Sequence, residues 1–454
     1  MRRYFLLLPF LLVSLFMSAQ KEDSVFIRAI SDDILNNGKA YDYLRQLTKQ
    51  VGGRVSGSPA MVKAENWGLK VMQELGPDKA WLQECMVPHW VRGGKDMAKL
   101  TAAGGSRTLD ALALGNSEGT GGKTISAPLM VVGSFDELDR RKEEAKGKIV
   151  LFNYKFRNDF VQTFQSYSDA VKYRGGAAIA ASKYGAVGVL VRSMTHSVDN
   201  HPHTGAMRYD TTIQKIPALA IGLQDADWIS DQISKGKITA SMSSHARMLP
   251  DTIGHNVIAE LTGSEFPNEV ITIGGHLDSW DPGEGAHDDG AGCVQSLEIL
   301  RVFKALGYKP KHTIRIVLFA NEENGGRGGD KYAEVAKEKG EKHIFALESD
   351  AGGFTPRGFG LTATDDKLAK FMSWQALIAP YGASEFKKGG GGSDISPLGK
   401  TFGTPLAGLN PDSQRYFDIH HARSDVFENV NKRELLLGAV NMAALVYLVD
   451  KYGM

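Results

Sequence analysis

The sequence predicts an α/β fold with a central, mixed but largely parallel β-sheet that is flanked by helices. After His255 the chain alternates between short apolar runs and helical patterns. The apolar runs are continuous, which is typical of strands buried on both faces of a sheet. The predicted elements are a strand at Val270–Ile273, a helix at Gly290–Leu306, a strand at Thr313–Ala320, a helix at Asp330–Lys339, a strand at Ile344–Leu347 and a closing amphipathic helix at Lys432–Tyr452.

The first half of the chain predicts a helical start and then a region rich in strands. Apolar spacing indicates helices within residues 24–75, interrupted by the Gly/Ser/Pro turn VGGRVSGSP, and short strands follow at Trp81–Trp90 and Ala98–Leu114. Between residues 127 and 246, GKIVLFNY, AVGVLVRS and IPALAIG are typical of short strands around a helical pattern at Ser166–Tyr184. We expect this block to fold as a small β-rich unit of its own.

The N-terminus has the pattern of a secretory signal peptide. Arg2 and Arg3 precede an uninterrupted apolar stretch, Tyr4–Met17, which ends in a Ser-Ala pair before a polar residue. A membrane anchor, the alternative, needs about 20 apolar residues, and this run is shorter. The sequence therefore predicts a cleaved signal peptide at residues 1–19 and an exported protein, either secreted or periplasmic.

The charge balance and the cysteine count exclude several classes of partner and fold. The chain has 53 basic and 52 acidic residues, and so balanced a surface has no electrostatic footprint for nucleic acid or anionic membrane. We expect no nucleic-acid partner, and no membrane span after signal cleavage. Cys85 and Cys293 are too few for a disulfide framework. We expect two free thiols, with Cys293 on the buried face of a helix.

Side chains that bind metals recur in the second half of the chain, nearly all where an apolar run ends. They are His276 and Asp278 in GGHLDSW, Asp288 in AHDDGAG, Glu322 and Glu323 in ANEENGG, Asp350 in ESDAGG, and His421 in IHHARSD. In sheets of this kind, ligands bind beyond the carboxyl ends of the strands. With Glu322 and Asp278 set aside, two histidines, two aspartates and one glutamate remain, and this set suits two zinc ions that share a carboxylate. Two metals beside a free carboxylate are suited to hydrolysis.

The residues alone leave two choices open within this set. Glu322 and Glu323 are neighbours that face different ways, so one can bind metal while the other stays free as a base. His420 stands beside His421, and adjacent residues of an extended segment point in opposite directions. We therefore expect one of the two histidines, and not both, to face a given ion.

Residues near the expected ligands predict supporting roles. Asp278 lies two residues beyond His276, where its carboxylate can accept the second N–H of the imidazole and strengthen it as a ligand; the alternative is an exposed aspartate in a turn. The segment His203–Gly205 either closes over the site or forms a loop in solvent, and we expect the solvent loop. The pair Tyr416 and Phe417 either lines a side-chain pocket or packs in the core.

Four segments, GGHLDSWDPGEGAHDDGAG, FANEENGG, ESDAGG and HHARSD, resemble the signature segments of the co-catalytic zinc exopeptidases. That family includes secreted bacterial aminopeptidases and glutamate carboxypeptidases. More narrowly, VGGRVSGSP, VPHWVRG, SFDELDRRKEEAKGKIV and PHTG resemble the carboxypeptidase Q group over nearly all of the mature length. The resemblance implies a zinc exopeptidase catalytic domain at residues 20–126 and 247–454, a protease-associated insertion at residues 127–246, and a homodimer.

The resemblance also implies a role for each candidate residue. The implied roles are one zinc held by His276 and Asp350, a second zinc held by Glu323 and His421, a bridge between them at Asp288, a general base at Glu322 and an orienting carboxylate at Asp278. The preference for His421 over His420 rests on an aspartate four residues later, Asp425. The family also has a cis peptide after the bridging aspartate, here between Asp288 and Asp289.

The implied activity is hydrolysis of dipeptides or other short peptides with free termini, through a water that bridges the two metals and a glutamate general base. Three rivals use related sequences: an aminopeptidase that acts on longer peptides, a mononuclear zinc glutaminyl cyclase, and a non-catalytic receptor or scaffold. All five ligands and the base are present, which argues against the scaffold. Departures from the family pattern are slight, because Asn321 and Asn324 merely flank the glutamate pair.

Overall fold

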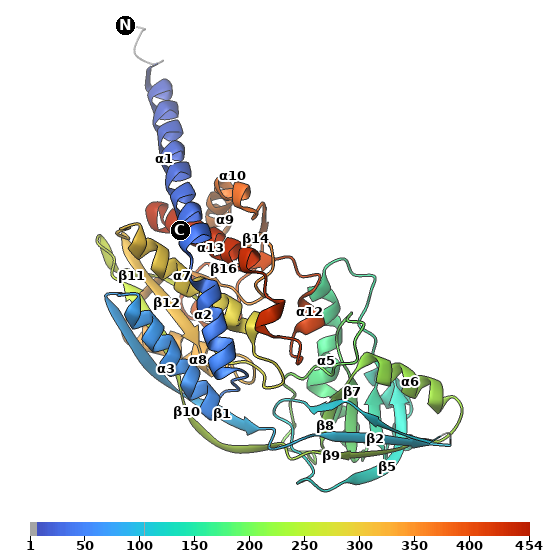
Figure 1. Ribbon diagram of the computed structural model, residues 1–454. Helices are drawn as coiled ribbons and strands as arrows, with labels where there is room; N and C mark the ends of the chain where they lie inside the picture. Colours follow the sequence, from blue (N-terminus) through green and yellow to red (C-terminus); the bar gives the residue numbers. More distant parts are fainter. Residues whose placement is uncertain (1–6, 104) are drawn as a thin grey trace.

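The structure is a computed structural model that describes residues 7–103 and 105–454, and for residues 7–20 it describes the backbone alone. The described residues form two eight-stranded sheets, each covered by helices (Figure 1). Residues 1–6 of the predicted signal peptide lie outside the described residues, and the side chains of its remainder are not described either. The signal peptide therefore stays a prediction.

A mixed sheet forms the centre of the first unit, as the sequence predicts. In spatial order its strands are β1 (Lys79–Val91), β10 (Arg247–Leu261), β12 (His312–Phe319), β11 (Phe266–His276), β13 (Lys342–Glu348), β16 (Leu406–Pro411), β14 (Pro356–Thr362) and β15 (Glu385–Lys388). The strands at its middle are parallel: β12 pairs with β11, β11 with β13, and β13 with β16. Their carboxyl ends therefore meet at one edge of the sheet.

The continuous apolar sequence of β12 is explained by burial on both faces. Every residue of this strand, HTIRIVLF, is buried, and alternate side chains face opposite sides of the sheet. Ile314, Ile316 and Leu318 pack into a large core on one face, whereas Val317 and Phe319 pack into a smaller core on the other. The prediction of a sheet covered on both faces is confirmed.

Most of the helices lie on the face with the large core. These are α1 (Leu7–Asn37), α2 (Ala40–Gln46), α3 (Pro59–Glu74), α7 (Ala291–Ala305), α9 (Asp365–Ser373), α10 (Gln375–Ile378) and α13 (Lys432–Tyr452). The opposite face is covered by α8 (Arg327–Glu338) and α11 (Ser396–Phe402). The VGGRVSGSP turn ends where α3 begins, because Oγ of Ser58 accepts a hydrogen bond from the amide of Met61 at 3.1 Å and Pro59 follows it.

The closing helix α13 forms at the predicted residues and lies in the core. Asn431 caps it by accepting hydrogen bonds from the amides of Arg433 at 2.9 Å and Glu434 at 3.2 Å. Among the residues that the structure describes, α13 is the single helix long and apolar enough to cross a membrane, and 83% of its most apolar window is buried inside the protein. It packs against α7 and α1, so core packing accounts for its apolar sequence.

The second sheet forms a separate unit with a core on each face. In spatial order its strands are β3 (Gly105–Leu109), β2 (Met97–Ala102), β9 (Thr239–Ser243), β5 (Ile125–Val132), β6 (Ile149–Phe152), β7 (Gly188–Arg192), β8 (Ala218–Ile221) and β4 (Ala111–Ala113). Its helices are α4 (Phe135–Arg140), α5 (Thr163–Ser182) and α6 (Leu223–Ile233). The expected strands and the expected helix within residues 127–246 are all present.

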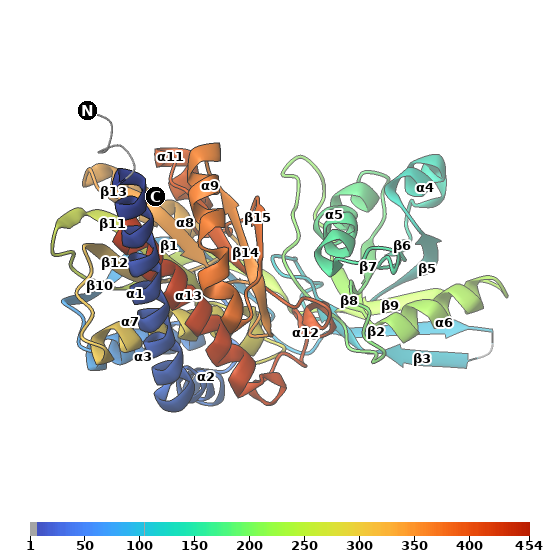
Figure 2. The ribbon, with the colours of Figure 1, turned by 90° about the horizontal axis from the view of Figure 1, so that it is seen from above.

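The chain enters the second unit from β1 and returns from it into β10, and these two strands pair antiparallel along their length (Figure 1). Strands β2, β3 and β4 precede residue 127 but pair within the second sheet, because β2 joins β9 and β4 joins β8. This sheet therefore begins ahead of the boundary expected from the sequence. The short helix α12 (Tyr416–Ile419) lies at the junction of the two units (Figure 2).

Both cysteines are buried and free, as predicted. Cys293 lies on the buried side of α7, where its thiol donates a hydrogen bond to the carbonyl of His276 at 3.0 Å. Short 3₁₀ or π turns complete the fold, at Leu47–Val51, Lys142–Glu144, Ala286–Gly290, Ala379–Tyr381 and Phe427–Asn429.

Candidate metal centre

Four of the predicted site residues follow three neighbouring strands of the central sheet. His276 is the last residue of β11, Glu322 and Glu323 follow β12, and Asp350 follows β13. Strand β11 lies between β12 and β13 and runs parallel to both. The fold therefore brings these four side chains to one edge of the sheet, where ligands bind in folds of this kind.

Asp288 enters the site from the turn Ala286–Gly290, directly before α7. Its peptide bond to Asp289 is cis, as the family resemblance implies. Two other carboxylates hold this turn in place. Asp425 accepts a hydrogen bond from the amide of Asp288 at 3.2 Å, and Asp289 accepts one from the amide of His276 at 3.1 Å. The turn is thereby fastened both to the end of β11 and to the segment that carries His421.

The two carboxylate oxygens of Asp288 face two different histidines. Oδ1 lies 3.2 Å from Nε2 of His276, which is also 3.4 Å from Oδ1 of Asp350. Oδ2 lies 3.2 Å from Nε2 of His421, which is 3.0 Å from Oε2 of Glu323. The five predicted ligands thus form two sets of three atoms that share one carboxylate.

The spacing and the chemistry of these atoms fit zinc. Ligand atoms about 2.0–2.2 Å from a tetrahedral zinc ion lie roughly 3.3–3.6 Å from one another, and the pairs above are 3.0–3.4 Å apart. Oδ2 of Asp288 and Oε1 of Glu323 are buried and accept no hydrogen bond from any described residue. Buried carboxylate oxygens without a donor are costly in free energy, so these atoms are arranged to receive a cation.

The electrostatics of the site also favour a cation. Burial raises the pKa of Glu323 to about 8 and that of Asp350 to about 6. Burial alone would lower the pKa of His421, but the nearby carboxylates of Glu323 and Asp288 raise it to about 10. Several buried acidic groups this close together need positive charge nearby. A divalent cation supplies that charge, so that the carboxylates can stay ionised and the histidines neutral.

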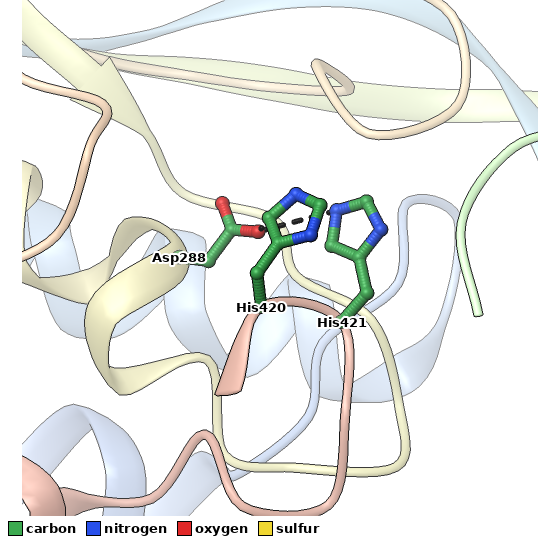
Figure 3. Close-up of side chains that lie close together, drawn as sticks. All are labelled: Asp288, His420 and His421. Atoms are coloured by element: carbon green, nitrogen blue, oxygen red, sulfur yellow. Dashed lines mark ion pairs between the residues drawn. The ribbon is translucent and has the colours of Figure 1, made fainter. Parts of the chain in front are cut away.

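His420 also faces the site, which the sequence did not predict. Its Nε2 lies 3.6 Å from Oδ2 of Asp288, and its ring stacks on the ring of His421, with centroids 3.5 Å apart and planes inclined by 20° (Figure 3). The expectation that the two histidines point in opposite directions is wrong, because His421 adopts a left-handed backbone with φ 62° and the segment is not extended.

The stacked rings indicate which histidine is the ligand. Within the described residues, Asp288 groups with His420 and His421 in one cluster of metal-binding type. A nitrogen lone pair lies in the plane of its own ring, so two nearly parallel stacked rings cannot both direct theirs at the same ion. His421 also contacts Glu323 at 3.0 Å, whereas among the acidic residues that the structure describes His420 contacts Asp288 alone. The geometry favours His421.

Asp278 contacts both His276 and the glutamate pair. Nδ1 of His276 lies 2.9 Å from the backbone oxygen of Asp278 and 3.7 Å from its carboxylate. The backbone carbonyl therefore orients the imidazole more directly than the carboxylate that the sequence suggested. The carboxylate instead accepts hydrogen bonds from the amides of Glu322 at 3.0 Å and Glu323 at 3.3 Å. It fixes the turn that carries the two glutamates.

Among the residues that the structure describes, none pairs with the carboxylate of Glu322. Within the described part of the chain, no cation and no hydrogen-bond donor contacts it, whereas Glu323 pairs with His421. Glu322 is partly exposed and Glu323 is buried. Burial is the main cause that raises the pKa of Asp278, and the charge of His276 lowers it in part. The negative charge of Glu322 raises this pKa further, so Glu322 lies beside the site. One glutamate of the pair is thus engaged and the other is available to accept a proton.

A small cavity adjoins the His421 half of the site. It is lined by Trp280, Gly283, Gly285, Asp288, Glu323, His421, Ala422 and Asp425. Tyr416 and Phe417 do not face this cavity; both are buried in an aromatic cluster between α12 and α5. Of the two roles left open for this pair, the structure favours packing.

The loop His203–Gly205 of the second unit reaches the site, so the expectation of a solvent-exposed loop is wrong. All three of its residues are buried. The amide of Thr204 donates a hydrogen bond to the carbonyl of His421 at 3.0 Å, and Nη1 of Arg174, on α5, lies 3.2 Å from Nδ1 of the same histidine. The sequence offered closure of this loop over the site as an alternative, but no local pattern specifies the contact, because it joins segments that are far apart in the chain.

A buried arginine from the VGGRVSGSP motif organises the segment between β11 and the Asp288 turn. Arg54 is fully buried. Its guanidinium donates hydrogen bonds to the carbonyls of Leu277, Glu284 at 2.7 Å and Gly285 at 3.0 Å. The hydrogen bonds to Leu277 and Gly285 are buried and the one to Glu284 is partly buried, so the arginine holds the backbone on either side of Asp278 in place.

We expect the variant Arg54→Met to be strongly destabilised. Two buried carbonyls and one partly buried carbonyl would lose their donor, at roughly 1–3 kcal/mol for each buried group, so the free energy of unfolding should fall by about 3 kcal/mol. Denaturant-induced unfolding measures this change. The control Arg28→Met removes an exposed pair with Asp32 and should change stability by less than about 0.5 kcal/mol. Equal unfolding midpoints for the two variants would contradict the role given to Arg54.

Comparison with known proteins identifies relatives over most of the chain. The sequence model described as Peptidase family M28 matches residues 256–446. Carboxypeptidase Q of Mus musculus is 36% identical over 412 residues, which cover 90% of this chain and 85% of that protein. Carboxypeptidase Q of Xenopus laevis is 38% identical over 398 residues, 87% of this chain and 82% of that protein.

Solved structures share the fold. The crystal structure of a peptidase M28 precursor from Shewanella amazonensis superposes with a TM-score of 0.90 at 30% identity and covers 95% of this chain and 97% of its own. A zinc aminopeptidase from Bacillus subtilis superposes with a TM-score of 0.65 at 22% identity, over 90% of this chain and 94% of its own. The second likeness concerns the fold alone.

Proposed function

The chain belongs to peptidase family M28 and is a zinc metallo-exopeptidase; from that premise we propose that it is an exported enzyme with two zinc ions per chain that hydrolyses dipeptides and other short peptides with free termini. One observation carries the proposal. The carboxylate of Asp288 offers one oxygen to the set around His276 and the other to the set around His421. A shared carboxylate between two ligand sets suits a two-metal hydrolase.

In the proposed site, His276 and Asp350 hold one zinc ion, Glu323 and His421 hold the other, and Asp288 bridges them. Distances of 3.0–3.4 Å between these atoms support the assignment. Bound zinc supplies Lewis acidity, which activates water and polarises the scissile carbonyl. The chain's own residues bind and orient the reactants and carry the proton.

Glu322 serves as the general base. Its free carboxylate takes a proton from the attacking water and returns it to the amine of the departing residue. Asp278 positions this base through the hydrogen bond from the amide of Glu322 at 3.0 Å. The backbone carbonyl of Asp278 accepts the Nδ1 proton of His276 at 2.9 Å, which leaves the Nε2 lone pair directed at the metal.

We also propose the following organisation for the whole protein. Residues 1–19 form a signal peptide that directs export, and the catalytic domain is interrupted by a protease-associated insertion that extends from about β2 to β9. The separate sheet with two cores of its own supports an insertion, and the pairing of β2 with β9 supports a start ahead of residue 127. The mature enzyme forms homodimers, as the family resemblance implies.

Two observations support the proposed preference for short peptides: the identity of the sequence relatives and the residues that lie beside the proposed metal centre. The relatives that match most of the chain are carboxypeptidases Q. On the His421 side, the buried loop His203–Gly205 and the ring of Trp280, whose centroid is 5.9 Å from that of His421, lie directly beside the proposed metal centre. We expect them to limit the length of the substrate on this side.

A peptide panel tests the proposed function. We expect the zinc-loaded protein to hydrolyse Leu-Ala with a higher kcat/KM than a tetrapeptide beginning with the same two residues. We expect N-acetyl-Leu-Ala, the matched substrate without a free amine, to be cleaved poorly, and a chelator to abolish activity. Zinc should be counted in the same samples at two ions per chain. A preference for the tetrapeptide would point to an aminopeptidase for longer peptides, and one zinc per chain would contradict the two-metal site.

A further inference from the structure

We propose that the second unit is part of the metal centre: its loop His203–Gly205 positions His421, so that the zinc ion held by Glu323 and His421 binds tightly only while the two units are docked. This inference rests on the proposed function, because it assigns a role toward the zinc ions of that site. In addition to the proposed function, it assigns to residues of the second sheet the positioning of a ligand for one of the two zinc ions.

The backbone of His421 is held from the second unit. The backbone of His421 has φ 62°. Residues other than glycine adopt this left-handed conformation uncommonly, and it persists where the surrounding structure holds it. The amide of Thr204 donates a hydrogen bond to the carbonyl of His421 at 3.0 Å, and Nδ1 of His203 donates one to the carbonyl of His420 at 2.7 Å. These two bonds fix both peptide groups that determine where the His421 ring points.

The imidazole itself is also held from the second unit. A histidine that binds metal through Nε2 keeps its proton on Nδ1 and must donate it. Two groups of the second unit lie close to Nδ1 of His421: the carbonyl of Thr204 at 3.3 Å, which can accept this proton, and Nη1 of Arg174 at 3.2 Å. Nη1 of Arg174 also donates a long hydrogen bond of 3.5 Å to the Thr204 carbonyl, and its Nη2 donates to the hydroxyl of Tyr167 at 2.7 Å. Thr204 is fully buried, so no water competes.

The other half of the site has no such dependence. Nδ1 of His276 is held at 2.9 Å by the carbonyl of Asp278, two residues away in the same unit. Asp350 and Asp288 also belong to the first unit. Disturbing the loop His203–Gly205 should therefore weaken the zinc site of His421 and leave the zinc site of His276 intact.

Gly205 shows how closely the two units approach each other. It has φ 125°, and a Cβ atom there would lie 2.5 Å from Cζ of Arg174 and 2.6 Å from Nδ1 of His421. Both distances are too short for a side chain, so Gly205→Ala must displace the ring of His421 or the guanidinium beside it. Gly175, on α5 of the same unit, is a matched control, because a Cβ there meets nothing within 4 Å.

The experiment compares zinc affinity in two pairs of variants. Gly205→Ala is paired with Gly175→Ala. His203→Leu, which removes the donor to His420, is paired with His201→Leu in the same loop, and His203→Asn restores a donor where Nδ1 stood. Each full-length protein is equilibrated with buffered zinc concentrations, and the bound zinc per chain is measured. Circular dichroism checks the fold, and the visible absorption of protein loaded with Co²⁺ reports the geometry around the metals.

We expect wild-type protein and both controls to bind two zinc ions, and Gly205→Ala and His203→Leu to bind one of the two about 10- to 100-fold more weakly. His203→Asn should recover most of the affinity, and the Co²⁺ spectrum should change for one site. Unchanged affinity for both ions in Gly205→Ala and His203→Leu would overturn the inference. Equal weakening of both ions, or no recovery in His203→Asn, would also overturn it. Wild-type protein that binds fewer than two ions would instead overturn the proposed function.

Discussion

Replacing Asp288 with alanine is expected to remove both zinc ions and nearly all peptidase activity. Its Oδ1 lies 3.2 Å from Nε2 of His276, and its Oδ2 lies 3.2 Å from Nε2 of His421. A single substitution therefore takes a ligand from each ion. Since metals contribute several kcal/mol to the stabilisation of a hydrolytic transition state, kcat/KM should fall by about 1,000-fold or more. Zinc per chain and kcat/KM for a dipeptide measure the two effects.

The contrast with single-ion ligands makes this prediction specific. His421→Ala and His276→Ala each remove a ligand from one set of atoms, so each should lower the zinc content toward one ion per chain. Asp330→Ala, at an exposed position of α8, should keep both ions and full activity. Asp288→Ala protein that still binds two zinc ions would show that this carboxylate does not bridge them.

Glu322→Gln is expected to keep both zinc ions and yet lose most turnover. Glutamine matches glutamate in size but cannot take a proton from water, and removal of a general base costs about 100- to 10,000-fold in rate. The loss should appear in kcat with little change in KM, because the carboxylate acts in the transition state. Steady-state kinetics on a dipeptide and zinc analysis of the same samples measure it.

The neighbouring residue supplies the control for this second prediction. Glu323 pairs with His421 at 3.0 Å, so Glu323→Gln should weaken the binding of one zinc ion, whereas Glu322→Gln should not. Glu334→Gln, at an exposed position on α8, should change neither property. If Glu322→Gln hydrolyses the dipeptide at the wild-type rate, then Glu322 is not the base.

The middle strands β11, β12 and β13 of the central sheet could be predicted because they are buried on both faces. Such strands need continuous apolar sequence, and β12 has it. The strands β10, β14, β15 and β16 were not predicted, and for β14 the reason is physical. Gly358 and Gly360 interrupt the apolar pattern of β14, and a Cβ at either position would lie within 2.1 Å of the backbone of Glu385 or Gly389. Close approach of neighbouring backbones requires glycine there, which hides the strand from any pattern of hydrophobic residues.

The candidate ligands could be predicted because the chemistry of zinc restricts which side chains can hold it and the fold restricts where they lie. His276, Glu323 and Asp350 follow strands that the sequence places in one sheet. Parallel pairing then brings them together without any knowledge of long-range contacts. The motifs that resemble a known family assign roles that spacing alone leaves open.

The orientation of individual groups could not be predicted. Adjacent histidines were expected to diverge, but the left-handed backbone of His421 stacks its ring on that of His420. That conformation is imposed by contacts such as the one from His203 to His420, which joins residues 217 positions apart in the chain. Neither periodicity nor a local motif encodes such a contact. The role of the Asp278 carboxylate was missed for the same reason, since it holds backbone amides more than 40 positions away.

Anomalous diffraction at the zinc absorption edge, from crystals of the zinc-loaded wild-type protein, tests the two-metal centre most directly. We predict two anomalous peaks, one among His276, Asp350 and Asp288, and the other among His421, Glu323 and Asp288. A single peak, or a second peak away from the Asp288 carboxylate, would contradict the account.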